Sequence, residues 1–288
     1  MHDQAAGLRR KLGMNGNVKQ AKTISILSGK GGVGKSNIAI NFSISLLRRQ
    51  KKVLLIDLDV GMGNVDILLG LHASRTIIDM FNQELSIHEI TEKGPNGLAY
   101  ISGGSACADF FTLDQAKMDY FLKQYEALVW MYDYIIFDMG AGVTSDSMFF
   151  VLASDECLVV TTQEPTSITD AYGMIKHIIS NKVDMPIYVV LNRSLTQKKG
   201  IKVVEEFKYV VARFLQTEIK LLGILPEDKT VTTAVIKQIP YVLLKEKAAV
   251  STAMVQLVNT YLSFSTEEFE VKTPLSFVRK LKQLMTGR

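Results

Sequence analysis

The chain has 288 residues, of which 47% are hydrophobic and 22% are charged, and this composition supports a large folded core and excludes general disorder. It contains two cysteines, neither with a second Cys or His at a metal-binding spacing, which excludes a disulfide framework. Its net charge of +4 resides in the two ends, and the mildly acidic body between them argues against a broad nucleic-acid-binding face.

The sequence begins without the apolar region of a signal peptide, and no stretch reaches the roughly 18 to 20 apolar residues that a spanning helix needs. We therefore expect a cytoplasmic protein in which both cysteines are reduced thiols. Three units are expected along the chain: a basic N-terminal segment over residues 1–21, a folded domain over 22–271 and a basic C-terminal segment over 272–288.

Apolar, β-rich runs alternate with amphipathic stretches through the body of the chain. Strands are expected at residues 22–28, 52–59, 98–102, 132–138, 156–162, 186–192 and 220–226, and helices at 35–50 and 114–130. Strands that are near-continuous runs of Val, Ile and Leu are typical of a parallel sheet covered by helices on both faces. The pattern predicts one doubly wound α/β domain whose ligands bind at the carboxyl ends of its strands.

The glycine-rich stretch GKGGVGKS, residues 29–36, fits the pattern G-x-x-x-x-G-K-[ST] of a phosphate-binding loop. An apolar strand precedes it and a helix-forming segment follows it, which is the setting that such a loop requires. We expect backbone N–H groups and the dipole of the following helix to bind phosphate oxygens, with Lys35 on the β- and γ-phosphates and Ser36 on Mg²⁺. The expected nucleotide contacts of this segment are Gly29, Lys30, Gly31, Gly32, Val33, Gly34, Lys35, Ser36 and Asn37.

Carboxylates stand at the carboxyl ends of two predicted strands. The strand at 52–59 ends with Asp57 and Asp59, and the strand at 132–138 ends with Asp138. Asp138 fits a group that holds Mg²⁺ directly or through its water shell, and we assign Ser36, Asp57 and Asp138 to a metal site. Either Asp57 or Asp59 is placed to orient or deprotonate an attacking water, and Asp57 is equally well interpreted as a strand-end cap.

The segment KGGVGKS is similar to the deviant Walker A motif of the MinD/ParA family of ATPases, and the resemblance extends over most of the folded domain. It implies the doubly wound, mostly parallel α/β fold of MinD-like P-loop NTPases (SIMIBI class), with ATP or ADP and Mg²⁺ as ligands. It also implies that Lys30 reaches the phosphates of the opposite subunit in an ATP-bound homodimer. Lys30 would then resemble an arginine finger, and ATP hydrolysis would require dimerisation.

The family pattern also assigns further residues. Water positioning falls to Asp59, which with Lys30 and Lys35 forms the expected catalytic set, and Asp57 becomes a supporting switch residue. The resemblance implies an adenine site formed by Asn192, Arg193, Pro226, Glu227 and Asp228. Gly140, in DMGAG, departs from the proline that MinD-like proteins usually carry there, which predicts a looser second switch segment.

The tail TPLSFVRKLKQLMTGR, residues 273–288, repeats apolar side chains every three or four positions, with basic residues in the other directions. A helix of about 12 residues is too short to span a bilayer but suits an anionic membrane surface. The residues assigned to membrane contact are Leu275, Phe277, Val278, Lys280, Leu281 and Leu284. The same face also suits a helix packed on the body, and both hold if it docks in the monomer and is released in the dimer.

The N-terminal stretch DQAAGLRRKL, residues 3–12, resembles the DQAxxLR activator segment of the FlhG family (also called YlxH or FleN), MinD-like regulators of flagellar number and placement. The resemblance implies that this segment stimulates the GTPase FlhF. Gln4 would enter the FlhF active site, with Asp3, Leu8 and Arg9 holding the segment in place. Binding to the flagellar C-ring proteins FliM and FliY is implied as well. The alternative is a basic chain end without a partner.

Three other functions are compatible with the same motifs. A MinD protein that positions the division site predicts stimulation of ATP hydrolysis by a MinE-like activator and no effect on FlhF. A ParA-like DNA-segregation ATPase predicts salt-dependent, nonspecific DNA binding, which the acidic body disfavours. A nucleotide-locked scaffold predicts negligible ATP turnover, so that replacing Asp59 would change little.

Overall fold

The computed structural model describes residues 20–59, 63–104, 115–140, 145–181, 185–267 and 276–286. Within these residues, eight strands form one sheet in the order β3-β4-β2-β5-β1-β6-β7-β8. All neighbouring strands are parallel except β3 and β4. The strands are β1 Lys22–Leu27, β2 Val53–Leu58, β3 Glu92–Lys93, β4 Ala99–Ile101, β5 Tyr134–Met139, β6 Glu156–Thr162, β7 Ile187–Ser194 and β8 Lys220–Pro226.

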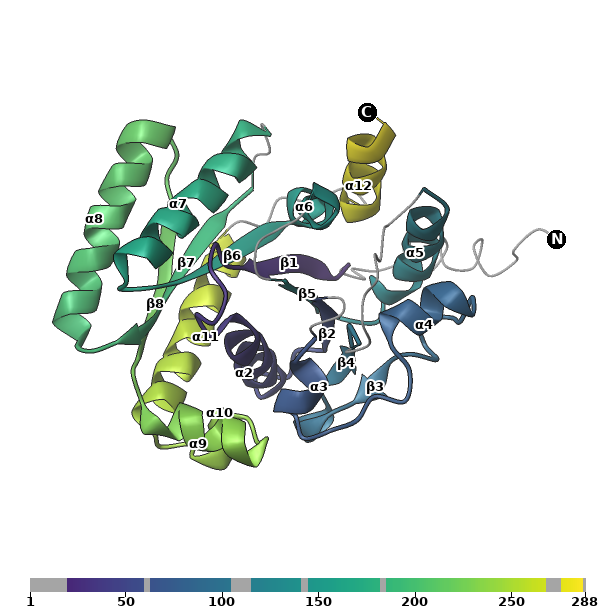
Figure 1. The fold of residues 1–288 in the computed structure, drawn as a ribbon, viewed down its shortest axis with the longest axis horizontal. Helices are drawn as coiled ribbons and strands as arrows, with labels where there is room; N and C mark the ends of the chain where they lie inside the picture. The colour runs from purple at the N-terminus through teal and green to yellow at the C-terminus, as the bar shows by residue number, and fades with distance from the viewer. Residues whose placement is uncertain are drawn as a thin grey trace.

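Helices cover both faces of this sheet, and Figure 1 shows α2 and α11 together on one side of it and α6 and α12 on the other. Successive side chains alternate between the two layers: Leu54 and Ile56 of β2 pack in one apolar cluster and Val53 and Leu55 in the other. The helices are α2 Lys35–Leu47, α3 Val65–Leu68, α4 Ile77–Asn82, α5 Gln115–Leu128, α6 Ser145–Ala153, α7 Pro165–Ser180, α8 Gln197–Leu215, α9 Lys229–Lys237, α10 Tyr241–Leu244, α11 Ala249–Glu267 and α12 Ser276–Thr286.

The predicted fold class is confirmed, and the predicted strands are observed with small changes at their ends. Strands 156–162 and 220–226 have the expected bounds, and the other five differ by up to two residues at an end. The short antiparallel strand β3 was missed, because two polar residues carry no strand signal of their own. The helix expected over 35–50 ends at Leu47, since Gln50 adopts a left-handed backbone conformation with a φ of 60°.

The tail forms the expected amphipathic helix, α12, but its apolar side packs on the body of the protein. Phe277, Val278 and Leu281 are buried, whereas Lys280 and Leu284 are half-buried. The ring of Phe277 lies 4.5 Å from that of Tyr125 in α5, centroid to centroid. It also lies 5.4 Å from Phe137 in β5 and 6.4 Å from Phe150 in α6. The docked arrangement of the tail is therefore the one that the structure contains.

Five residues with predicted roles lie outside the described residues. They are Leu275, predicted to contact the membrane, and the activator residues Asp3, Gln4, Leu8 and Arg9. Among the described helices, none is both long and apolar enough to cross a membrane.

Candidate nucleotide-binding site

The phosphate loop connects β1 to α2, and its glycines permit the backbone path that a side chain would obstruct. Gly32 and Gly34 have φ values of 76° and 93°, in the region that L-residues rarely adopt. The side-chain amide of Asn192 donates a 2.8 Å hydrogen bond to the backbone carbonyl of Val33. A Cβ atom at Gly34 would lie only 2.5 Å from that same amide nitrogen. Asn192, expected at the base, therefore also holds the loop.

The start of the loop lies directly against α7. A Cβ atom placed on Gly29 would overlap the backbone carbonyl group of Asp170 in α7. No larger residue fits at Gly29 unless the loop or the helix moves. The first glycine of the motif thus has a packing role in addition to its conformational one.

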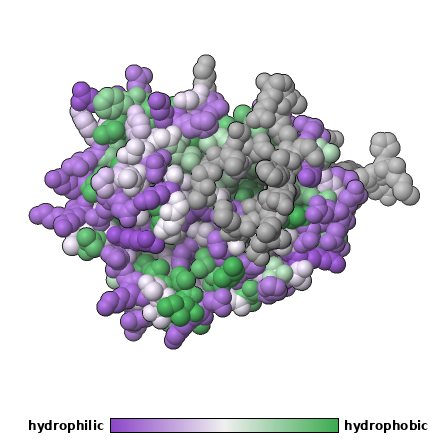
Figure 2. All heavy atoms as spheres, viewed as in Figure 1, coloured by the Kyte–Doolittle hydropathy of each residue, from purple (hydrophilic) through white to green (hydrophobic). Residues whose placement is uncertain are grey.

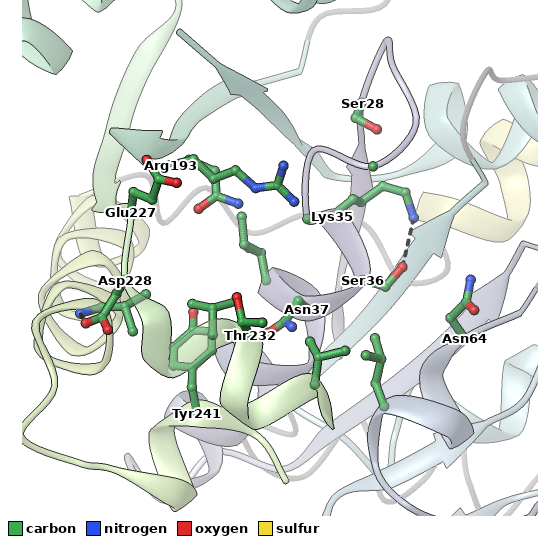
Figure 3. A pocket seen from close by; sticks show the side chains of 18 of the residues that line it. Ser28, Lys35, Ser36, Asn37, Asn64, Arg193, Glu227, Asp228, Thr232 and Tyr241 are labelled. Carbon is green, nitrogen blue, oxygen red and sulfur yellow. Dashed lines mark hydrogen bonds between the residues drawn. The ribbon is translucent and has the colours of Figure 1, made fainter. Parts of the chain in front are cut away.

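Lys35, at the first position of α2, is buried and forms an ion pair with the Oδ1 atom of Asp138 at the end of β5. Its ammonium group also lies 3.4 Å from the hydroxyl oxygen of Ser36, as Figure 3 shows. The second carboxylate oxygen of Asp138, Oδ2, is buried and has no hydrogen-bond partner among the described residues. Lys35 thus contacts both Ser36 and Asp138, and a serine hydroxyl and a carboxylate oxygen are oxygen ligands of the kind that suits Mg²⁺.

Asp57 and Asp59 occupy different environments although only one residue separates them. Asp57 is fully buried and pairs in register with Asp138 across β2 and β5. Burial raises the pKa of Asp57 to about 7, and the Asp138 carboxylate adds to this effect. Asp59 is half-buried and lines the cleft beside Lys35 and Ser36. Burial also raises the pKa of Asp59 above its ordinary value, although the charge of Lys35 opposes the shift.

The structure places these two carboxylates differently. Asp59 lines the cleft, and Asp57 does not. Both carboxylate oxygens of Asp57 accept hydrogen bonds from backbone N–H groups, and its assignment to the metal site stays a prediction. The residue next to the Asp59 carboxylate is Gly140, and a Cβ atom there would lie 3.0 Å from Oδ1 of Asp59. A glycine at this position leaves room for the Asp59 carboxylate.

Lys30, the additional lysine of the loop, lies outside the group of residues that line the cleft. Its ammonium group donates hydrogen bonds to the carboxylate of Glu164, at 2.8 Å, and to the hydroxyl of Thr166, at 3.2 Å. Glu164 is the N-cap residue directly before α7, and Thr166 lies in the first turn of that helix. The hydrogen bond and charge of Lys30 hold the pKa of Glu164 below its ordinary value. In this structure the lysine thus contacts its own subunit.

A cleft of about 750 Å³ extends from the phosphate loop to the segment that follows β8. Figure 3 shows Lys35, Ser36 and Asn64 at one end and Arg193, Glu227 and Asp228 at the other. Its lining includes Asp59 and most of the predicted nucleotide contacts: Gly31, Gly32, Gly34, Lys35, Ser36, Asn37, Asn192, Arg193, Pro226, Glu227 and Asp228. Gly29, Lys30, Val33, Asp57 and Asp138 do not line the cleft themselves.

Asp228 caps α9 in addition to lining the cleft. One carboxylate oxygen accepts a 2.8 Å hydrogen bond from the N–H of Thr230, and the other accepts a 3.3 Å bond from the N–H of Val250. Burial acts to raise the pKa of Asp228, but these hydrogen bonds outweigh it and the net shift is downward. The side chain therefore orders the two segments that form this end of the cleft.

Sequence reasoning missed the apolar part of the lining, contributed by α3, α9 and α10. These residues are Ile67, Leu68, Val231, Val235 and Tyr241. Figure 2 shows a group of hydrophobic side chains at the lower part of the face viewed, where Figure 1 places α3, α9 and α10. Amphipathic helices supply such residues without any local motif, so only the three-dimensional arrangement reveals them.

Comparisons with known proteins agree with this geometry. The ParA family model, described as NUBPL iron-transfer P-loop NTPase, matches residues 19–262. The antiactivator FleN of Pseudomonas aeruginosa is 30% identical over 223 residues, which cover 77% of this chain and 80% of FleN. The flagellum site-determining protein YlxH of Helicobacter pylori is 34% identical over 209 residues, covering 72% of this chain and 70% of YlxH.

A likeness to a solved structure supports the same assignment. MinD of Aquifex aeolicus, in a complex of MinC and MinD, aligns with a TM-score of 0.70 and 27% identity, covering 88% of this chain and 99% of that one. The phosphate loop, the strand-end carboxylates and the cleft all lie within residues 19–262, which the ParA family model matches. The protein therefore belongs to the MinD/ParA family of P-loop ATPases.

Proposed function

We propose that this protein is an ATPase that forms a homodimer when it binds ATP and that regulates the number and placement of flagella. The observation that carries the ATPase part is the convergence of Lys35, Ser36 and Asp59 on one end of a cleft whose other end is formed by Arg193 and Glu227. The flagellar part is supported by the similarity to FleN and YlxH and by the DQAAGLR stretch near the N-terminus.

The chemistry follows from the charges at the site. Backbone N–H groups of the phosphate loop would bind the phosphate oxygens of ATP, and Lys35 would exchange its contact with Asp138 for the β- and γ-phosphates. Asp59 would orient the attacking water and accept its proton, a role that suits a carboxylate whose pKa burial has raised. Ser36 and Asp138 would hold Mg²⁺, which neutralises phosphate charge when it is bound.

Hydrolysis would require a second subunit because Lys30 acts across the dimer. Lys30 would leave Glu164 and Thr166 and contact the phosphates bound by the partner subunit, which makes it a counterpart of the arginine finger. Such a group contributes roughly 10³ to 10⁵ in rate. The ATP-bound dimer, rather than the monomer, would therefore be the active form.

Membrane association would depend on the C-terminal helix. Residues 272–288 would bind the inner, anionic surface of the cell membrane through the side chains that now pack on α5 and α6. One copy binds weakly, since each basic residue near an anionic leaflet contributes around 1 kcal/mol, and two copies on a dimer gain from effective concentration. Release of α12 on dimerisation would therefore link ATP binding to membrane residence.

The partners would be FlhF and, at the flagellar C-ring, FliM and FliY. The deciding experiment measures the GTPase rate of purified FlhF with a peptide of residues 1–22 and with its Gln4→Ala variant. Stimulation by the first peptide but not by the second supports the proposal. Absence of stimulation by both the peptide and the full-length protein would remove the FlhF role and leave a membrane ATPase with another partner.

A division-site ATPase is the second candidate, and the likeness to MinD of Aquifex aeolicus favours it. The two functions differ in the activator of ATP hydrolysis. Purified protein on anionic vesicles should respond to a MinE-type activator if it is a MinD protein. The flagellar regulator should be indifferent to MinE and should stimulate FlhF.

A further inference from the structure

The backbone N–H groups of three residues that follow β2, Asp59, Asn64 and Val65, donate to a single buried side chain, Asp57. The Oδ1 atom of Asp57 accepts a 2.9 Å hydrogen bond from the backbone N–H of Asp59. The Oδ2 atom accepts bonds from the backbone N–H groups of Asn64, at 3.0 Å, and Val65, at 3.2 Å. Residues 60–62 between these points lie outside the described residues.

Glycines allow the chain to close over this carboxylate. A Cβ atom at Gly63 would lie 2.9 Å from Oδ2 of Asp57, which is too short for a normal contact. A Cβ atom at Gly103 would lie 3.0 Å from the backbone oxygen of Asp57 and 3.2 Å from that of Asp59. At Gly63 and Gly103 the backbone therefore lies so close to Asp57 that a residue with a side chain would not fit without a shift.

The two ends held by Asp57 carry residues that line the nucleotide cleft. Asp59 and Asn64 both belong to the cleft lining, whereas Asp57 does not. Hydrogen bonds from backbone N–H groups to a buried carboxylate are charge-assisted and stronger than bonds between neutral groups. Loss of them would free the backbone at Asp59 and at the start of α3 together.

We infer that Asp57 is a positioning residue for ATP hydrolysis, which sets the place of Asp59 and Asn64 by fixing their backbone N–H groups. It would act through these two residues, since they line the cleft and Asp57 does not. The predicted effect of Asp57 on the rate of hydrolysis rests on the proposed ATPase activity. The predicted effect of Asp57 on the backbone at Asp59, Asn64 and Val65 rests on the hydrogen bonds alone.

The first test compares the wild type with Asp57→Asn, in which one of the two acceptor oxygens becomes an NH₂ donor. Hydrogen exchange of the nucleotide-free protein should show faster exchange of the amides of Asp59, or of Asn64 and Val65. The kcat for ATP should fall on the order of 10- to 100-fold, since a misplacement of about 1 Å is enough for such losses. The Kd for Mg-ADP should change by less than about threefold, because the phosphate loop is untouched.

Gly63→Ala provides an independent variant that leaves the carboxylate in place. Its new methyl group would displace the chain from Oδ2 of Asp57, so both amide exchange and kcat should change in the same direction as in Asp57→Asn. Two controls are matched to these changes. Asp133→Asn alters a carboxylate that accepts a 2.7 Å bond from the N–H of Lys52, away from the cleft. Gly173→Ala adds a methyl group where no atom lies within 4 Å.

Two outcomes would overturn the inference: unchanged exchange of all three amides in Asp57→Asn, or an unchanged kcat in that variant. Unchanged amides together with a more than about tenfold rise in the Mg²⁺ concentration needed for half-maximal rate would make Asp57 a metal ligand instead. If the wild type itself fails to hydrolyse ATP, the proposed function fails. Amide exchange in the nucleotide-free protein still decides whether Asp57 fixes the backbone N–H groups of Asp59, Asn64 and Val65.

Discussion

The ammonium group of Lys30 lies 2.8 Å from the carboxylate of Glu164, so the lysine that is expected to act in a second subunit is paired within its own. Both side chains are exposed, 41% for Lys30 and 61% for Glu164, and exposed ion pairs contribute little to stability. The pair can therefore open at low cost, as the proposed action of Lys30 on the phosphates of a second subunit would require.

Replacing Lys30 should separate ATP binding from dimerisation. Lys30→Ala is expected to bind ATP with an affinity close to that of the wild type and to remain a monomer, because the cleft does not include Lys30. Light scattering after size exclusion in the presence of a non-hydrolysable ATP analogue measures the mass. The companion variant Glu164→Gln, which frees Lys30, should dimerise as well as the wild type or slightly better. A normal ATP-bound dimer of Lys30→Ala would refute the role across subunits.

Asp59→Ala should abolish ATP turnover without preventing ATP binding. General-base catalysis contributes about 10²- to 10⁴-fold, so phosphate release should fall by that order. The trapped ATP state should then accumulate as a dimer that co-sediments with vesicles. Unaltered phosphate release in Asp59→Ala would show that another group positions the water, and a wild type with equally negligible turnover would indicate a nucleotide-locked scaffold.

The buried pair of Lys35 and Asp138 predicts an effect on stability that is distinct from nucleotide binding. Lys35→Ala leaves the Asp138 carboxylate buried without its cation, which typically costs about 3 to 5 kcal/mol. Adding Asp138→Asn removes the stranded charge and should recover much of the free energy of unfolding, whereas ATP affinity should stay low. Urea unfolding of the nucleotide-free variants measures the free energy of unfolding, and calorimetric titration measures the ATP affinity. A double variant no more stable than Lys35→Ala would contradict the pairing.

The pH dependence of stability should carry the signature of Asp57. Its pKa is about 7 in the folded protein and 3.8 is the ordinary value, so between these values the folded state binds more protons than the unfolded state. The free energy of unfolding therefore contains a favourable contribution near pH 4 that is lost as the pH rises to about 7. Measured without nucleotide or Mg²⁺, the stability of the wild type relative to Asp57→Asn should decrease from pH 5 to pH 8. A difference that is constant over this range would exclude the raised pKa.

Removal of residues 273–288 should have two consequences. Vesicle co-sedimentation should be lost while ATP binding is retained, because α12 lies away from the cleft. The truncated protein should also unfold more easily, since burying each large apolar side chain contributes about 1.5 to 3 kcal/mol and the deletion uncovers the rings of Phe137 and Phe150. Retained vesicle binding would place the membrane site in another part of the chain.

The sequence patterns predicted the features that are specified by residues close together in the sequence. The phosphate loop and the apolar strands were found in this way, because a short segment contains everything that specifies them. The docking of α12 was left open, since an apolar helix face has the same pattern whether it meets lipid or Phe137. The hydrogen bonds of Asp57 were not predicted, because no local sequence pattern shows that the backbone N–H groups of Asn64 and Val65 point at its carboxylate.

The missing side chain at Gly29 has a mechanical consequence for the whole site. The phosphate loop and the backbone of α7 at Asp170 touch with nothing compressible between them. Residues along one side of α7 are exposed. Because the backbone at Gly29 packs directly on α7, a shift of this helix toward the phosphate loop would have to displace the loop backbone as well.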